Sequence, residues 1–106
     1  MKFSRNEPGH YQADTEIRRY VIARTGGGWV VRYWKLQVTA GVKHTIGLGV
    51  EDAEDSAVAD TMRLAMDMAN RCEQLILDGY GRLFTDMKPL TRALRDAYEA
   101  EAESYR

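Results

Sequence analysis

The sequence predicts an α+β domain in which a three-stranded antiparallel meander is followed by two helices, in the order β-β-β-α-α. Three observations support this fold class. The apolar residues recur at every second position before residue 50 and at about every 3.6 positions after it, as in strands and helices respectively. Short, polar links separate the strand segments, which favours antiparallel neighbours. The length of 106 residues suits one domain with a single core, residues 1–106.

The sheet is expected within residues 16–50, and residues 1–15 before it are expected to be mobile. The three strands are predicted at residues 17–24, 29–38 and 43–50. The first two are rich in β-branched and aromatic residues, and Thr25-Gly26-Gly27-Gly28 between them suits a hairpin loop. A second turn is expected around Thr39-Ala40-Gly41, and clean alternation of polar and apolar residues follows it.

Two helices are expected after the sheet, over residues 52–78 and 86–105. The four acids of residues 51–55 would lie in the first turn, where the helix dipole favours negative charge and Asp52 can cap exposed N–H groups. Asp78-Gly79-Tyr80-Gly81 is expected to end this helix. Pro89 suits the first turn of the second helix, where its missing N–H is not needed.

The two halves of the chain carry opposite charge. Residues 1–50 hold eight Lys or Arg against three acids, a balance of +5, and residues 51–106 hold seven against thirteen, a balance of −6. The net charge of −1 argues against a protein that coats nucleic acid indiscriminately, so any nucleic-acid site has to be local. No apolar run suits a signal peptide or a membrane span. We therefore expect a cytoplasmic protein with no membrane partner.

Catalytic and metal chemistry have little support in the sequence. His10 and His44 are the only histidines, and with the single Cys72 they give no metal-ligand spacing. A strand rather than a helix follows Gly26-Gly27-Gly28, which argues against a phosphate-binding loop. Cys72 has apolar neighbours at helical spacing and is expected to be a buried thiol, in keeping with a reducing cytoplasm. We expect no catalytic residue, metal or cofactor, and interpret the chain as a non-enzymatic binding module.

The second predicted strand has large apolar side chains on both of its faces. Trp29 and Tyr33 occupy odd positions, whereas Val30, Trp34 and Leu36 occupy even ones. One helix can cover only one face of a sheet. The other face is therefore expected to meet the second helix, a second copy of the chain in a homodimer, or a foreign partner.

The order of elements over residues 17–70 resembles the βββα DNA-binding domain of ethylene-response factors. It is similar also to the arm-binding N-terminal domain of phage tyrosine integrases. In both families an aromatic residue opens the second strand on the core side, the place of Trp29 here. In these families a glycine, an aromatic or aliphatic residue, a capping residue, two variable positions, an acid and an alanine lead into the helix. Here Val50, Asp52 and Asp55 match this pattern, and Ser56 stands where the alanine is usual.

These families lay the sheet, rather than the helix, into the major groove of DNA. By this resemblance, the face opposite the helix would carry the residues that bind DNA or another partner, Arg18, Tyr20, Arg24, Arg32, Trp34 and Lys43. Arginine can reach guanine edges or phosphates, and an indole can pack on a sugar or a thymine methyl group. A small chain of this kind suits a phage or mobile-element accessory protein. The alternative is a protein-interaction or homodimeric module that uses the same sheet face.

Overall fold

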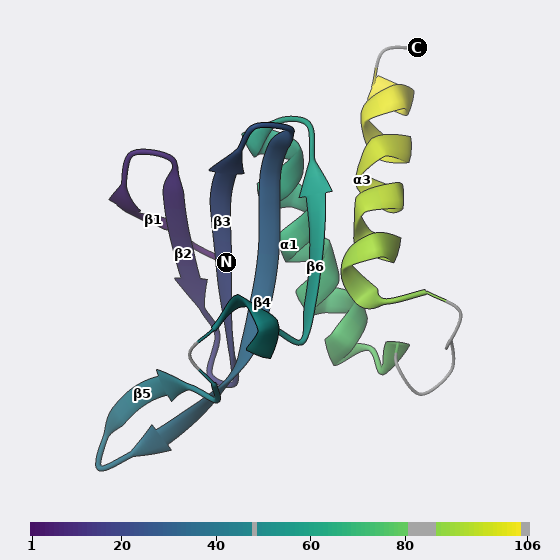
Figure 1. The fold of residues 1–106 in the computed structure, drawn as a ribbon. Helices are drawn as coiled ribbons and strands as arrows, with labels where there is room; N and C mark the ends of the chain where they lie inside the picture. Colours follow the sequence, from purple (N-terminus) through teal and green to yellow (C-terminus); the bar gives the residue numbers. More distant parts are fainter. Residues whose placement is uncertain (48, 81–86, 105–106) are drawn as a thin grey trace.

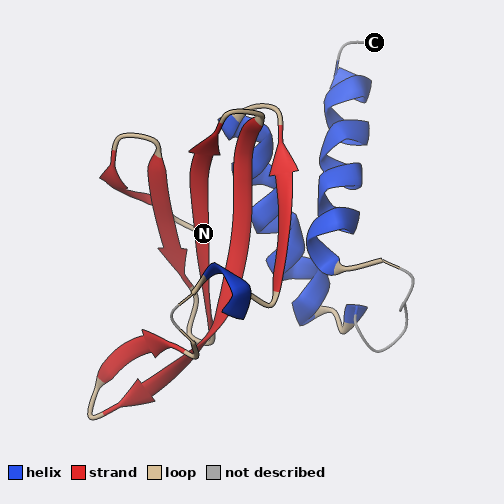
Figure 2. Cartoon of the chain, viewed as in Figure 1, coloured by secondary structure: helices blue, strands red, loops and turns tan. Residues whose placement is uncertain are grey.

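A computed structural model describes residues 1–47, 49–80 and 87–104 of the chain. Its elements are β1 (Ser4–Glu7), β2 (His10–Asp14), β3 (Arg18–Thr25), β4 (Gly28–Thr39), β5 (Val42–Thr45), a 3₁₀ turn (Val50–Asp52), β6 (Asp55–Ala59), α1 (Met62–Leu77) and α3 (Pro89–Ser104). The strands form one antiparallel layer, and α1 packs behind it (Figure 1). The secondary structure is α+β, as Figure 2 shows. The predicted three-stranded meander is wrong, because the described residues form a six-stranded sheet.

The long strand β4 organises this sheet. Strands β1 to β5 follow one another in chain order, and β6 pairs with β4 as well. The first part of β4 lies between β3 and β6, while residues 36–39 pair with β5. Residues 36–45 therefore form a two-stranded ribbon, which projects beyond the rest of the sheet in Figure 1. We call this segment the ribbon.

The chain between residues 52 and 61 is not the start of a helix, contrary to the prediction of a helix over residues 52–78. Asp55–Ala59 is the strand β6, and α1 begins only at Met62, where the Thr61 side chain accepts a hydrogen bond from the Leu64 N–H. The acids of residues 51–55 therefore do not cap α1. Asp55 instead accepts a hydrogen bond from the Leu90 N–H at 2.9 Å, and so caps the first turn of α3.

Other predicted boundaries also changed. The segment of residues 1–15 holds the strands β1 and β2, although it was expected to be mobile. The third predicted strand ends at Thr45 instead of residue 50, because the chain turns at Gly47 with a φ of +89°. α1 ends at Leu77, as the predicted stop requires, and Gly79 has a φ of +85°. Leu48, Gly81 and residues 86 and 105 lie outside the described residues.

The core lies between the sheet and the two helices. Its largest fully buried side chains are Tyr20, Ile22, Val31, Met68, Cys72 and Leu90. The predicted burial of Cys72 is confirmed, and this burial raises the pKa of its thiol to about 12. Within the described residues, neither helix has the length and apolar character needed to span a membrane.

Candidate functional site

The register of β3 and β4 decides which side chains share a face of the sheet. Thr25 pairs with Gly28, so the link between the strands is only the two residues Gly26-Gly27. Even-numbered residues of β3 then pair with odd-numbered residues of β4, as Tyr20 pairs with Tyr33. Residues paired across an antiparallel ladder project on the same face.

The predicted binding residues consequently do not share one face. Arg18, Tyr20 and Arg24 lie on the face that packs against α1, and Arg32 and Trp34 lie on the opposite face. The expectation that all five lie opposite the helix is wrong, because a link with an even number of residues pairs even-numbered positions of β3 with odd-numbered positions of β4. The sixth residue, Lys43, lies on the ribbon, where it pairs with Val38.

Arg18 and Tyr20 belong to a polar network between the sheet and α1. The Arg18 guanidinium donates two hydrogen bonds to the Glu73 carboxylate, with Nε–Oε1 and Nη2–Oε2 distances of 2.6 and 2.9 Å. The Tyr20 hydroxyl donates to the same carboxylate at 2.9 Å. Burial alone would raise the pKa of Glu73, but the hydrogen bonds from Arg18 and Tyr20 hold this pKa below its usual value. These side chains join β3 to α1, and Tyr20 is fully buried.

Trp34 is covered by the connection between β5 and β6. Its indole Nε1 donates to the carbonyl of Gly49 at 3.1 Å, and only 9% of the residue is exposed. In Figure 1 the teal 3₁₀ turn of this connection lies in front of the lower part of β4. Part of the second sheet face is thus covered by the chain's own β5–β6 connection, which none of the expected alternatives included.

The upper part of this face has no described element in front of it in Figure 1. Arg32 lies there, half-buried between Val21 of β3 and Ser56 of β6. Val21 is also half-buried, and Val58 is exposed. The surface around Arg32 therefore combines one cation with small polar and apolar side chains.

The helix arginines all form ion pairs, whereas the sheet cations do so only in part: Arg18 pairs with Glu73, Arg19 with Asp14 and Lys35 with Glu54. Every arginine in α1 and α3 pairs with an acid, Arg63 with Glu101, Arg71 with Asp67, Arg92 with Asp96 and Arg95 with Glu99. Within the described part of the chain, Arg24, Arg32 and Lys43 have no such ion pair. The sequence signal for this contrast is an acid-free stretch, because residues 17–50 contain six Lys or Arg and no Asp or Glu.

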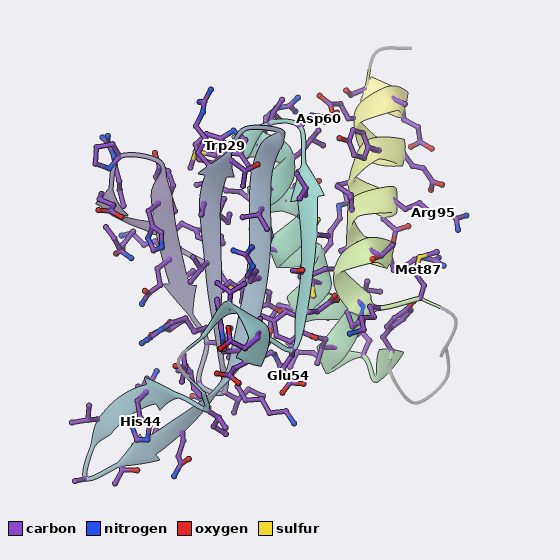
Figure 3. All side chains as sticks on the ribbon, in the orientation of Figure 1. Trp29, His44, Glu54, Asp60, Met87 and Arg95 are labelled. Carbon is purple, nitrogen blue, oxygen red and sulfur yellow. The ribbon has the colours of Figure 1, made fainter. Side chains whose placement is uncertain are left out.

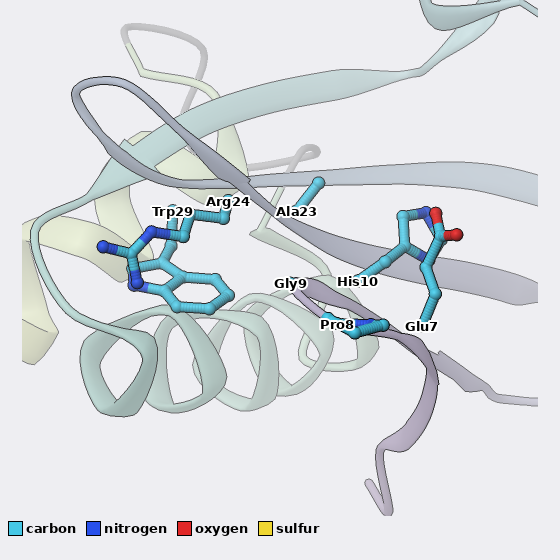
Figure 4. Close-up of a pocket in the computed structure, with 7 residues that line it drawn as sticks. All are labelled: Glu7, Pro8, Gly9, His10, Ala23, Arg24 and Trp29. Atoms are coloured by element: carbon cyan, nitrogen blue, oxygen red, sulfur yellow. The ribbon is translucent and has the colours of Figure 1, made fainter.

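A shallow depression of about 600 Å³ lies at the end of the sheet, beside the turn between β1 and β2 (Figure 4). Its lining residues are Glu7, Pro8, Gly9, His10, Ala23, Arg24 and Trp29. The Arg24 guanidinium lies over the Trp29 ring, 5.4 Å from its centre. Trp29, expected in the core, is half-buried and packs against the core's margin. A cation over an aromatic ring can contact a phosphate or stack with a base.

The Trp29 indole and the His44 imidazole lie far apart. Figure 3 shows Trp29 at one end of the sheet and His44 near the tip of the ribbon at the other. No three His, Cys, Asp or Glu side chains gather as metal ligands in the described ranges. In comparisons with known proteins, no family model, no curated protein and no solved structure matches this chain.

Proposed function

We propose that this chain is a non-enzymatic binding module that binds DNA through the positively charged strands β3, β4 and β5. The observation that carries the proposal is that three of the six cations of these strands lack an ion pair with any described residue. The helix arginines pair with acids of the same chain, while Arg24, Arg32 and Lys43 have no ion pair with any described residue. Phosphates supply the missing counter-charge, and contacts with them are the main sequence-independent source of DNA affinity.

The positions of Arg32 and Lys43 suit a duplex lying along one face of β4. Arg32 lies within the strand, and Lys43 pairs with Val38, which projects on the same face as Arg32 by the alternation of the strand. From Arg32 to Val38, β4 spans about 20 Å at roughly 3.3 Å per residue, and one turn of duplex DNA is about 34 Å long. These two cations can therefore meet phosphates within one turn, whereas Arg24 lies on the face toward α1 and would not contact the same duplex.

The resemblance to integrase arm-binding domains adds a biological setting to this proposal. A free-standing module of this kind suits an accessory protein of a phage or mobile element. A cytoplasmic location goes with it, because the lone thiol of Cys72 needs no oxidising compartment.

The test is the binding of a fluorescently labelled duplex, measured by anisotropy at several salt concentrations. Arg32→Ala should weaken binding and reduce the slope of log affinity against log salt by about 1, the effect of one lost phosphate contact. Arg95→Ala is the matched control, because Arg95 is exposed but pairs with Glu99 on α3. Absence of binding at low salt, or equal losses from both variants, would contradict the proposal.

The alternative, a protein-interaction or homodimeric module, rests on a different observation. Val38, Val42 and Ile46 are large apolar residues that lie exposed in or beside the ribbon. Exposed apolar side chains of this kind, here on both faces of the ribbon, can be buried against a second copy or another protein. Sedimentation of the wild-type chain and of Val38→Asp would test this alternative, which predicts a dimer that the substitution dissociates.

A further inference from the structure

Exposed apolar side chains gather at the ribbon and at its base. Val38 and Val42 belong to the ribbon, Ile46 follows it, and each of the three is more than half exposed. Ile17, also more than half exposed, lies at the base, where its carbonyl accepts a hydrogen bond from the Leu36 N–H at 2.9 Å. Exposed apolar side chains gathered in one area of a surface mark a contact with another protein.

An apolar groove of about 290 Å³ lies next to the base of the ribbon. Its lining residues are Thr15, Glu16, Ile17, Glu73 and Leu77. Leu77, the last residue of α1, is 63% exposed, so the apolar wall of the groove is open to solvent. The Nζ of Lys43 lies 3.5 Å from the carbonyl of Thr15, which lines the groove. The projecting ribbon and the groove are therefore neighbours on one surface.

The ribbon and the groove also have complementary charge. Lys43 of the ribbon and Glu16 of the groove have no ion pair with any residue that the structure describes. Val38 pairs with Lys43, so one face of the ribbon presents an apolar side chain beside a cation. The groove presents the apolar Ile17 beside the carboxylate of Glu16. Each surface thus supplies what the other lacks.

We propose that two copies of this chain form a dimer in which the ribbon of each copy lies over the groove of the other. Val38 covers Ile17 and Leu77 of the second copy, and Lys43 pairs with Glu16 of the second copy. The same contact occurs twice about a two-fold axis, so the assembly closes at two chains. This inference goes beyond DNA binding and does not depend on it.

The occupant of the groove is a second copy because the chain carries both halves of the contact on neighbouring surfaces. A foreign protein would have to supply both a groove for the ribbon and a ribbon for the groove. Lys43 links the dimer to the proposed DNA binding, since its ammonium group cannot pair with Glu16 and with a phosphate at once. A duplex that takes up Lys43 should therefore shift the dimer toward monomers.

The experiment is sedimentation of the intact chain over a wide range of concentrations, without DNA. The wild-type chain should dimerise. Glu16→Lys and Lys43→Glu should each raise the dissociation constant by about tenfold or more, because like charges then meet in both contacts, and the double variant should restore the dimer. Leu77→Asp should also dissociate it. Val58→Asp is the matched control, because Val58 is an exposed valine of β6, outside the ribbon and the groove.

The outcomes separate this inference from the proposed function. A wild-type chain that stays monomeric overturns the inference and leaves a foreign protein as the occupant of the groove. A dimer that persists in Leu77→Asp, or a double charge variant that stays monomeric while folded by circular dichroism, overturns it too. So does a dimer that Val58→Asp dissociates, because the contact would then include β6. A chain that dimerises as expected but binds no duplex at low salt overturns the proposed function alone.

Discussion

Replacing Glu73 by alanine should cost this fold several kcal/mol, because Glu73 holds Arg18 and Tyr20 against α1. The side chains of Arg18 and Glu73 are each only 11% exposed, and the carboxylate accepts three hydrogen bonds from the two β3 residues. Removing one partner of such a pair leaves the other charge buried and uncompensated, which typically costs about 3–5 kcal/mol. The expected change lies near the lower end, because Arg18 keeps some contact with water.

Urea unfolding followed by circular dichroism measures this change as a shift of the midpoint at constant slope. The control is Glu99→Ala, because Glu99 pairs with Arg95 where both side chains are more than half exposed, 62% and 57%. An exposed helix pair of this kind contributes about 0.5 kcal/mol or less. A Glu73→Ala chain within that range of the wild type would refute the reasoning.

The same network predicts the direction of the pH dependence. The hydrogen bonds from Arg18 and Tyr20 hold the pKa of Glu73 lower in the folded chain than in the unfolded chain. The unfolded chain therefore binds the proton more readily, and this contribution to stability is fully present above the unfolded pKa of about 4.3. It should be lost as the pH falls through the folded pKa, and the Glu73→Ala chain should lack this part of the acid sensitivity.

Substitutions at Ala40, Gly28 and Trp34 test other parts of the fold by the same unfolding assay. Ala40→Gly should stabilise the chain by about 1 kcal/mol, because Ala40 has a φ of +53° that glycine adopts more readily; an unchanged midpoint would contradict this. Gly28→Ala should destabilise by roughly 1–3 kcal/mol, because Gly28 has a φ of +143° and an added Cβ would clash with the Ala59 carbonyl oxygen. Gly27→Ala is the control and should leave the midpoint unchanged, because no atom lies within 4 Å of its added Cβ. Trp34→Phe should lower the free energy of unfolding by about 1 kcal/mol, because it removes the indole N–H that donates to the Gly49 carbonyl. Trp34→Ala should lower it by about 3–5 kcal/mol, because it removes a buried aromatic side chain. An unaffected Trp34→Ala chain would show that the covering connection does not need the indole.

The strands with large side chains could be predicted from the sequence, and those with small or polar ones could not. β3 and β4 carry β-branched and aromatic residues in alternation, so their positions were nearly right. β6 has the sequence Asp-Ser-Ala-Val-Ala, whose small residues follow an acidic run that equally suits a helix start. Pairing with the exposed edge of β4 decides its conformation, and such long-range pairing leaves no local pattern. β1 escaped notice for a similar reason, since its four residues are all exposed and polar.

The candidate site depended on which positions of β3 and β4 share a face. The prediction placed even-numbered residues of both strands together. The link between the strands has an even number of residues, so even positions of β3 pair with odd positions of β4, and the cations of the two strands fall on different faces. The burial of Trp34 could not be predicted either, because the covering connection contains no pattern that predicts where it crosses the sheet.

Because the ribbon extends from β4 away from the core, the strand has one part that holds the fold together and another that projects from it. The first part of β4 carries the fully buried Val31 and pairs with two strands, while the last four residues pair with β5 alone. Substitutions at the exposed positions of the ribbon therefore alter little of what keeps the chain folded. Related chains can therefore diverge in the ribbon while the rest of the sheet stays the same, so sequence variation should accumulate fastest at the tip of the ribbon.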